Sequence, residues 1–164
     1  MRLKDKVAII TGAGQSEADG MGNGRATALS FARQGAKLML ANRSSPSMDE
    51  TARQVRAEGF AVESMLADIT NEDDCRQLMA ATTQAFGRID ILHNNVGAGT
   101  VEGDTADIDL AAWRQCLEMN LTGPMLLSKH VLPIMRAQQS GCITHTSSVA
   151  SVASLPLIAY KAAK

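Results

Sequence analysis

A tyrosine and a lysine near the end of the chain have the types and the spacing of an acid–base pair. Tyr160 and Lys164 are four residues apart, so on a helix both side chains lie on one face. A phenol is a weak acid with a pKa of about 10, and a neighbouring ammonium group stabilises its phenolate. Such a pair could donate a proton to an oxygen that gains negative charge, as when a hydride adds to a carbonyl.

An asparagine in the preceding helical segment has a carbonyl group that a helix cannot satisfy. Pro124 lies four residues after Asn120, and proline has no N–H to donate to that carbonyl, so the helix should kink here. A buried carbonyl without a helical partner needs a water, which makes Asn120 a candidate for holding one, with a purely structural kink as the alternative. The apolar residues of the same segment are expected to form a core stripe: Trp113, Leu117, Leu121 and Leu127.

Glycines crowd the segment that follows the first apolar run. Thr11-Gly12-Ala13-Gly14 ends that run, and Gly20-Met21-Gly22-Asn23-Gly24 opens the next helical segment. Without side chains, the backbone there can approach a pyrophosphate, whose charge is balanced by N–H groups at a helix N-terminus. The strict GxGxxG spacing is absent, so the segment predicts a dinucleotide site with a plain loop as the alternative.

The elements that must position these residues follow from the apolar pattern. Short apolar runs of strand length alternate with segments of helical spacing. Glycines stand where left-handed caps are needed after three of the helices, and Asn71 stands at an N-cap ahead of three acidic residues. The alternation predicts an α/β fold with a doubly wound, Rossmann-like parallel sheet and helices on both faces. The expected strands are 6–11, 37–41, 61–67, 89–94 and 142–147, and the expected helices are 25–34, 48–58, 71–86 and 110–136.

Composition and charge exclude several classes of protein. The chain has 164 residues, enough for one domain, and no apolar run approaches the roughly 18 residues of a membrane-spanning helix. Its first residues lack the apolar stretch of a signal peptide, so a cytoplasmic location is expected. A net charge of −1 provides no basic surface for nucleic acid. The cysteines lack metal-ligand spacing and are expected to be reduced core thiols: Cys75, Cys116 and Cys142.

On its motifs the sequence resembles the short-chain dehydrogenase/reductase family along the whole chain. The glycine-rich turn matches the family's TGxxxGxG pattern once an insertion of about six residues is allowed within 15–21. Residues 94–97, Asn-Asn-Val-Gly, are similar to its NNAG motif, with Val96 in place of alanine. Asn120 and the serine pair 147–148 stand where the family has its asparagine and serine, and residues 160–164 match YxxxK.

The resemblance implies an oxidoreductase that moves a hydride between NAD(P) and a small carbonyl or alcohol, with no metal ion. Tyr160 would be the acid/base, Lys164 would hold the nicotinamide ribose, and Asn120 would hold a relay water. Ser148 is favoured to polarise the carbonyl on strand parity, whereas Ser147 fits the family's usual separation from the tyrosine. The residues implied in cofactor binding are Gly12, Gly14, Gly22, Asn23, Gly24, Asn42, Arg43, Asp68, Ile69, Asn95, Gly97, Tyr160 and Lys164.

Two residues at the end of the second strand bear on the choice of cofactor. A carboxylate there would hold the adenosine 2′-hydroxyl of NAD. Asn42 lacks that charge and Arg43 could bind a 2′-phosphate, so NADP is favoured over NAD. The rival functions are a non-catalytic nucleotide-binding regulatory protein, which has no need of a complete catalytic set, and an enoyl reductase, which the serine and YxxxK spacing fit less well.

The chain stops at the last residue of YxxxK, in what should be the first turns of a long helix. The Ala162-Ala163 pair is a strong helix former and favours continuation. Members of the family run to roughly 250 residues, within the size of one domain. The expectation is therefore a single domain over 1–164 that is incomplete at its C-terminus, with a homodimer or homotetramer as the full-length form.

Overall fold

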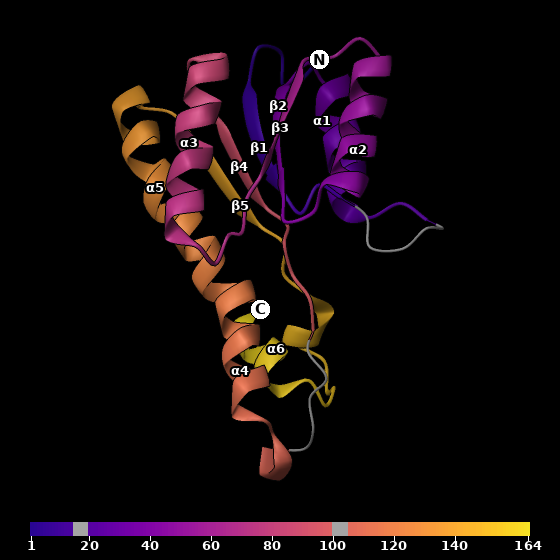
Figure 1. The fold of residues 1–164 in the computed structure, drawn as a ribbon, viewed down its shortest axis with the longest axis vertical. Coiled ribbons are helices and arrows are strands. Elements are labelled where there is room, and N and C mark those ends of the chain that lie inside the picture. The colour runs from indigo at the N-terminus through magenta and orange to yellow at the C-terminus, as the bar shows by residue number, and fades with distance from the viewer. Residues whose placement is uncertain (15–19, 100–104) are drawn as a thin grey trace.

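A five-stranded parallel sheet organises the part of the chain that the computed structural model describes, residues 1–14, 20–99 and 105–164 (Figure 1). The strand order is β3-β2-β1-β4-β5, and every neighbouring pair is parallel. The predicted doubly wound α/β fold is therefore confirmed, and the predicted strands differ from these only by one or two residues at their ends. The strands are β1 (Val7–Thr11), β2 (Lys37–Asn42), β3 (Val62–Leu66), β4 (Ile91–Asn94) and β5 (Cys142–His145).

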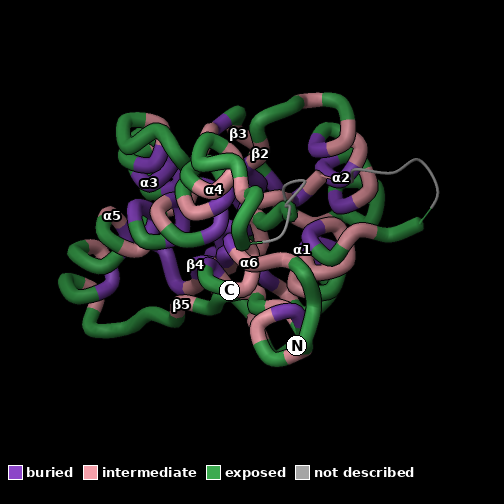
Figure 2. The backbone as a smooth tube through the Cα atoms, turned by 90° about the horizontal axis from the view of Figure 1, so that it is seen from below, coloured by how far each residue is buried: buried purple, intermediate pink, exposed green. Residues whose placement is uncertain are grey.

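Helices cover both faces of the sheet (Figure 1). One face carries α1 (Asn23–Arg33) and α2 (Ser45–Ala57), and the other carries α3 (Glu72–Phe86) and α5 (Gly123–Gln138). Neighbouring residues of β1 serve opposite cores: Ile9 packs in the core under α3 and α5, and Ile10 in the core under α1 and α2. Both side chains are fully buried, which explains why the central strand is apolar throughout. In Figure 2 the buried residues, drawn in purple, are concentrated in this sheet and on the sides of the helices that face it.

The predicted helix caps are confirmed. Gly35, Gly59 and Gly87 follow α1, α2 and α3 with φ of 92°, 84° and 78°, the left-handed conformation that glycine adopts at least cost. Asn71 caps α3, because its side chain accepts hydrogen bonds from the N–H groups of Asp73 and Asp74.

The predicted helix over 110–136, with its expected kink at Asn120, is three segments in the structure. An α-helical part, α4 (Leu110–Leu117), passes into a π-helical turn, η2 (Glu118–Thr122), and then into α5. Gly123 donates its N–H to the carbonyl of Glu118, five residues back. The next residue, Pro124, has no N–H and donates no hydrogen bond to the preceding turn. The wider turn changes which side chains face inward, so the predicted core stripe is wrong at Leu121, whose exposed fraction is 53%.

The segments beyond the carboxyl ends of the strands lie below the sheet in Figure 1. They include α4, α6 (Ile158–Ala163) and two short 3-10 turns, η1 (Thr105–Asp107) and η3 (Val149–Ser151).

Of the predicted core thiols, Cys75 and Cys116 are buried, but Cys142 at the start of β5 is exposed. Among the described helices, none combines the length and the apolar character needed to cross a membrane.

Candidate active site

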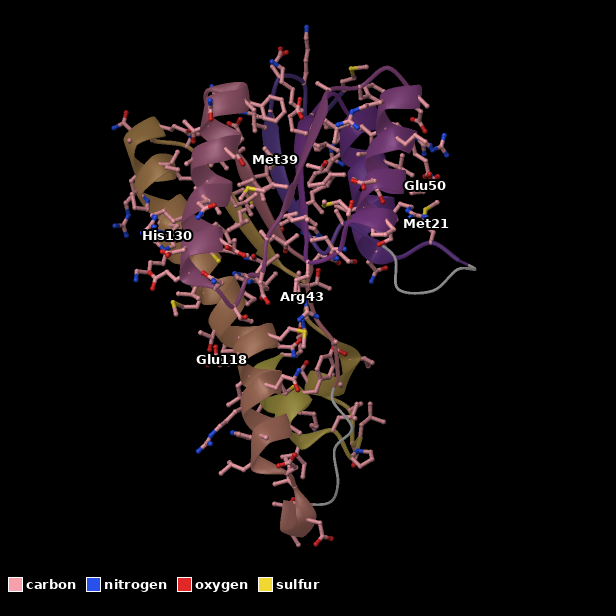
Figure 3. The ribbon with its side chains drawn as sticks, in the orientation of Figure 1. Met21, Met39, Arg43, Glu50, Glu118 and His130 are labelled. Carbon is pink, nitrogen blue, oxygen red and sulfur yellow. The ribbon has the colours of Figure 1, made fainter. Side chains whose placement is uncertain are left out.

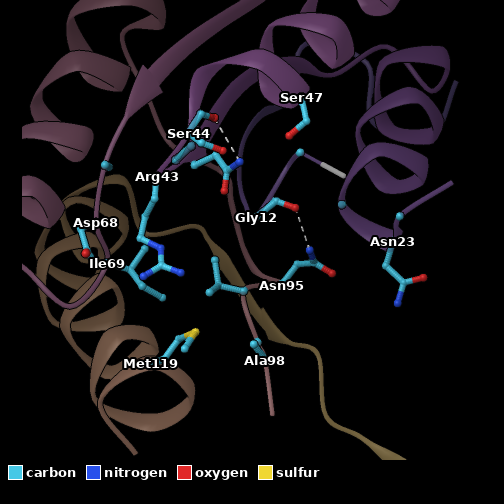
Figure 4. A pocket seen from close by; sticks show the side chains of 18 residues that line it. Gly12, Asn23, Arg43, Ser44, Ser47, Asp68, Ile69, Asn95, Ala98 and Met119 are labelled. Carbon is cyan, nitrogen blue, oxygen red and sulfur yellow. Dashed lines mark hydrogen bonds between the residues drawn. The ribbon is translucent and has the colours of Figure 1, made fainter. Parts of the chain in front are cut away.

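A cavity of about 690 Å³ opens at the carboxyl ends of β1 to β4 (Figure 4). The chain crosses from one face of the sheet to the other between β1 and β4, and parallel sheets bind ligands at such a point. Residues 15–19 of the predicted insertion lie outside the described residues. The cavity is lined by these residues that the sequence proposed for nucleotide binding: Gly12, Gly14, Gly22, Asn23, Gly24, Asn42, Arg43, Asp68, Ile69, Asn95 and Gly97.

Two helix N-termini at this cavity are suited to anions. The first turns of α1 and α2 contain no acidic residue, and neither N-cap, Gly22 nor Ser44, makes a side-chain capping bond. Their N–H groups and helix dipoles therefore attract negative charge from a ligand. The first turn of α3, in contrast, is capped by Asn71 and contains three acidic residues.

The glycine-rich turn is packed too tightly for side chains. A Cβ on Gly24 would overlap the carbonyl oxygen of Gly12. The start of α1 can therefore pack against the Gly12 backbone only if residue 24 is glycine. Asn95, just after β4, donates from Nδ2 to the same Gly12 oxygen at 3.1 Å, and its N–H donates to Thr11 Oγ1 at 3.2 Å. The ends of β1 and β4 are thereby tied together beneath the cavity.

The opposite wall of the cavity combines charge with an apolar surface. Figure 4 shows Arg43 extending from the end of β2 toward Asp68 and Ile69. Burial raises the pKa of Asp68, but hydrogen bonds from the N–H and hydroxyl of Thr70 and the charge of Arg43 outweigh it and hold that pKa below its ordinary value. Ile69 is 4% exposed and lies against Gly123 at the start of α5.

Lys164 lies against Gly97, one of the residues that line the cavity. Its Nζ donates to the carbonyl oxygens of Thr146 at 3.1 Å and Val96 at 3.4 Å, which follow β5 and β4. The same atom is 5.7 Å from the centre of the Tyr160 ring, as the i, i+4 spacing predicts. A Cβ on Gly97 would lie 2.5 Å from this Nζ, so glycine lets the ammonium approach. Burial lowers the pKa of Lys164, and neighbouring Cys116 offsets part of that effect.

Asn120 lies in the π-helical turn and is buried, with 5% of its surface exposed. Its Nδ2 donates to the carbonyls of Cys116 at 2.9 Å and Ala98 at 3.0 Å. Within the described part of the chain its Oδ1 has no hydrogen-bond partner. A second cavity, of about 420 Å³, is lined by Asn120 together with Ser147 and Lys164. The role of Asn120 in holding a water stays a prediction.

The two candidate serines have different partners. Ser147 donates from Oγ to the carbonyl of Lys164 at 3.0 Å, and Ser148 Oγ accepts from the N–H of Ala150 at 3.1 Å. The strand ends at His145, before either serine, so the alternation on which Ser148 was favoured does not extend to this pair. Both serines remain candidates.

Several residues of the nucleotide cavity were not predicted. Ser44 and Ser47 line it from the start of α2, and Met119 lines it from the π-helical turn. The expected start of α2 was three residues too late, although Ser44-Ser45-Pro46 has the N-cap and early proline typical of a helix start. Nothing in the local sequence indicated Met119.

In the part of the chain that the structure describes, neither the histidines nor the acidic residues form a metal site. Within the described ranges, no three His, Cys, Asp or Glu side chains lie close enough to hold an ion. His130 on α5, labelled in Figure 3, instead pairs with Glu72 of α3 at 3.0 Å, and Lys129 pairs with the same carboxylate. His93 lies 2.8 Å from the hydroxyl of Thr144 across β4 and β5.

Comparison with known proteins identifies the family. The model of the short chain dehydrogenase family matches residues 6–164. The chain belongs to this family. Among short-chain dehydrogenase relatives, cis-4-hydroxycyclohexanecarboxylate dehydrogenase of Sinomonas cyclohexanicum is 34% identical over 98% of this chain and 62% of its own length. A 3-oxoacyl-[acyl-carrier-protein] reductase of Synechocystis is 36% identical over 99% of this chain and 64% of its own. The chain spans less than two thirds of both relatives.

Solved short-chain dehydrogenase structures have the same fold. One from Burkholderia xenovorans is 41% identical, with a TM-score of 0.93 over 99% of this chain and 64% of that protein. An NAD+-bound xylitol dehydrogenase is 30% identical and superposes with a TM-score of 0.92, and the match covers all of this chain and 61% of the xylitol dehydrogenase chain. A metagenomic short-chain oxidoreductase in complex with NADP gives 0.90 at 30% identity, over all of this chain and 72% of its own. These two neighbours bind different forms of the nicotinamide dinucleotide.

Proposed function

We propose that the protein is an oxidoreductase that transfers a hydride between NAD(P) and a small carbonyl or alcohol substrate. The observation that carries the proposal is the half-buried ammonium of Lys164, which lies 5.7 Å from the centre of the Tyr160 ring and against Gly97 of the nucleotide cavity. Two relatives support it by name, one a dehydrogenase of a hydroxy acid and the other a reductase of a 3-oxoacyl group. These names favour carbonyl and alcohol chemistry over enoyl reduction.

The cavity fits a dinucleotide on three grounds. Its floor is a glycine turn that side chains would fill, two acid-free helix N-termini open into it, and its volume of about 690 Å³ suits an extended ligand. When bound, the nicotinamide supplies or accepts the hydride.

The protein's own groups manage the charge and the proton. Tyr160 donates a proton to the alkoxide oxygen, or takes one from the alcohol, and the positive charge of Lys164 stabilises the phenolate. One of Ser147 and Ser148 donates a hydrogen bond to the same substrate oxygen. Asn120 holds its turn against Ala98 beside the nucleotide cavity and is the candidate for binding a relay water.

We further propose that the cofactor is NADP. Asn42 offers an amide where a carboxylate would repel a 2′-phosphate, and Arg43 is a nearby cation. The hydroxyls of Ser44 and Ser47 and the N-terminus of α2 add donors at the same end of the cavity. A homodimer or homotetramer and a cytoplasmic location remain predictions.

Replacing Tyr160 by phenylalanine tests the proposed chemistry. The ring remains but the proton donor is lost, so kcat should fall by a factor of about 100 or more while the Kd for the nucleotide changes little. Full-length protein should be assayed by single-turnover kinetics and nucleotide titration. Retention of most of the activity would contradict the mechanism, and a non-catalytic regulatory protein would show no turnover before the substitution either.

A further inference from the structure

One buried threonine joins three segments behind the nucleotide cavity. Thr51 of α2 is fully buried, and its hydroxyl donates to the carbonyl of Ala13 at 2.8 Å, with the carbonyl of Ser47 at 3.1 Å as a second acceptor. The same hydroxyl accepts a hydrogen bond from Nε of Arg25 at 3.0 Å. A single oxygen therefore contacts the glycine-rich turn, α1 and α2.

Arg25 strengthens this connection from the first turn of α1. In addition to the bond to Thr51, its Nη2 donates to the carbonyl of Ser47 at 3.1 Å. These two hydrogen bonds run from α1 to the first two turns of α2, and a guanidinium holds such a pair in a fixed geometry. Neither Arg25 nor Thr51 lines the cavity, so a role for them must act through the residues they hold.

The segments they hold are the two anion-binding ends of the cavity. In the proposed function, the N-terminus of α1 would receive the pyrophosphate, and the N-terminus of α2, with Ser44 and Ser47, would receive the 2′-phosphate. The gap between the turn and α2 is narrow, because a Cβ on Gly14 would overlap Ser47 Oγ and lie 2.6 Å from Asn42 Nδ2. A small shift of α2 would change its width.

We propose that Arg25 and Thr51 are positioning residues that set the binding site for the 2′-phosphate. The inference rests on the proposed use of NADP. A ligand with both a 5′- and a 2′-phosphate fixes the distance between the two, so it binds well only when both helix ends have the matching separation. A ligand with the 5′-phosphate alone has no such requirement. Loss of the connection should therefore weaken binding of the first ligand and spare the second.

The test is calorimetric titration of the full-length protein with adenosine 2′,5′-bisphosphate and with adenosine 5′-monophosphate. Selectivity for the 2′-phosphate is measured by the ratio of the two dissociation constants, that of the monophosphate divided by that of the bisphosphate. Thr51→Val keeps the shape and removes the hydroxyl, and Arg25→Met removes the guanidinium. Each should reduce the ratio about fivefold or more, the effect of roughly one hydrogen bond, with the affinity for the monophosphate nearly unchanged.

Two controls accompany these variants. Thr51→Ser restores the hydroxyl and should keep the selectivity. Arg53→Met removes an exposed arginine of the same helix, which pairs with Glu50, and should also keep it. If Thr51→Val does not fold, Arg25→Met and Arg53→Met decide the matter.

The outcomes separate this inference from the proposed cofactor. If the unchanged protein binds both ligands equally, the proposed preference for NADP is wrong, and the inference with it. If the unchanged protein is selective but Thr51→Val and Arg25→Met are equally selective, only the inference is overturned. Parallel losses for both ligands would likewise overturn it, because they indicate a general structural role.

Discussion

The proposed preference for NADP over NAD depends on the side chain at the end of β2. Asn42 presents an amide nitrogen that donates to the carbonyl of Ser44 at 3.2 Å, and Arg43 lies next to it. Asn42→Asp would place a negative charge beside the position for a 2′-phosphate and an acceptor beside the 2′-hydroxyl of NAD. The kcat/KM for NADP should fall about tenfold or more, while that for NAD rises.

Steady-state kinetics with both cofactors check this prediction. Asn71→Asp is the matched control, because it makes the same chemical change at the N-cap of α3, where aspartate is also a good cap. A protein that already uses NAD as well as NADP before substitution would contradict the premise.

Besides its proposed role next to Tyr160, Lys164 connects the segments that follow β4 and β5. Lys164→Met removes the ammonium from the carbonyls of Val96 and Thr146 and from the phenol. Both kcat and nucleotide affinity should fall, the former by a factor of about 100, since the phenolate loses its neighbouring charge. Lys161→Met, on the same helix but bonded to the carbonyl of Ala153, should leave both near the unchanged values. Loss of turnover alone would limit Lys164 to catalysis.

At the scale of elements, the cap of α3 offers a direct measurement of helix-end energetics. Asn71 satisfies two N–H groups of the first turn, and Glu72, Asp73 and Asp74 favour the positive end of the helix. Asn71→Ala should lower the free energy of unfolding by about 1 kcal/mol, measured by urea denaturation, while Asn71→Asp changes it little. Equal stability of all three proteins would show that water satisfies these groups as well as the side chain does.

The regular elements were predictable because their signals are local. Strand-length apolar runs, glycine at left-handed caps and Asn71 before an acidic turn all depend on a few neighbouring residues. The π-helical turn is different. Pro124 indicated a disturbed helix, but whether the chain would kink or widen depends on packing around Asn120 and Gly123 that no local pattern encodes.

The candidate site divides in the same way. Most residues implied in nucleotide binding lie at strand ends or at the start of α1, so parallel pairing brings them to one cavity, whereas Tyr160 and Lys164 lie outside its lining. The serines could not be distinguished because β5 ends at His145, before the pair, and the hydrogen bonds of Ser147 and Ser148 depend on the following turn. Thr51 also escaped prediction, since a buried threonine in a helix carries no signal of its distant partner Ala13.

At the scale of the whole molecule, a buried carboxylate joins the strands at the edge opposite the cavity. Asp90, whose side chain is 3% exposed, receives a bidentate pair from Arg88, the N–H of Val7 and a longer contact from Lys6. Its backbone also pairs with Val7 and with Cys142. The amino ends of three strands therefore meet at one residue.

Protonation of this group should weaken the fold in acid. Burial raises the pKa of Asp90, but Arg88, the Val7 N–H and Lys6 together outweigh it and hold that pKa below its ordinary value. A carboxyl whose pKa is lower in the folded than in the unfolded state stabilises the fold above the unfolded pKa of about 4, and loses that contribution as the pH falls through the folded value.

Asp90→Asn should therefore destabilise the full-length protein by about 1 to 3 kcal/mol at pH 7, toward the lower end because Arg88 is half exposed. Urea unfolding at neutral pH and near pH 3 should show the difference shrinking in acid. Glu50→Gln, which removes an exposed pair with Arg53, should have little effect at either pH. An undiminished difference at low pH would contradict the assignment.

The hydrogen-bond donors around the cavity share a property that affects which substitutions the sequence can tolerate during evolution. Lys164, Asn95 and Asn120 all direct their side-chain N–H groups to main-chain oxygens, those of Val96, Thr146, Gly12, Ala98 and Cys116. Every residue carries such an oxygen, so the acceptor positions tolerate substitution wherever the new side chain fits, as valine does where the family motif has alanine. Mutational tolerance is thus unequal. The donors are restricted in type, whereas the acceptors other than Gly12, whose φ of 65° favours glycine, are restricted mainly by the path of the backbone. A one-residue deletion beside them should therefore be more damaging than most replacements.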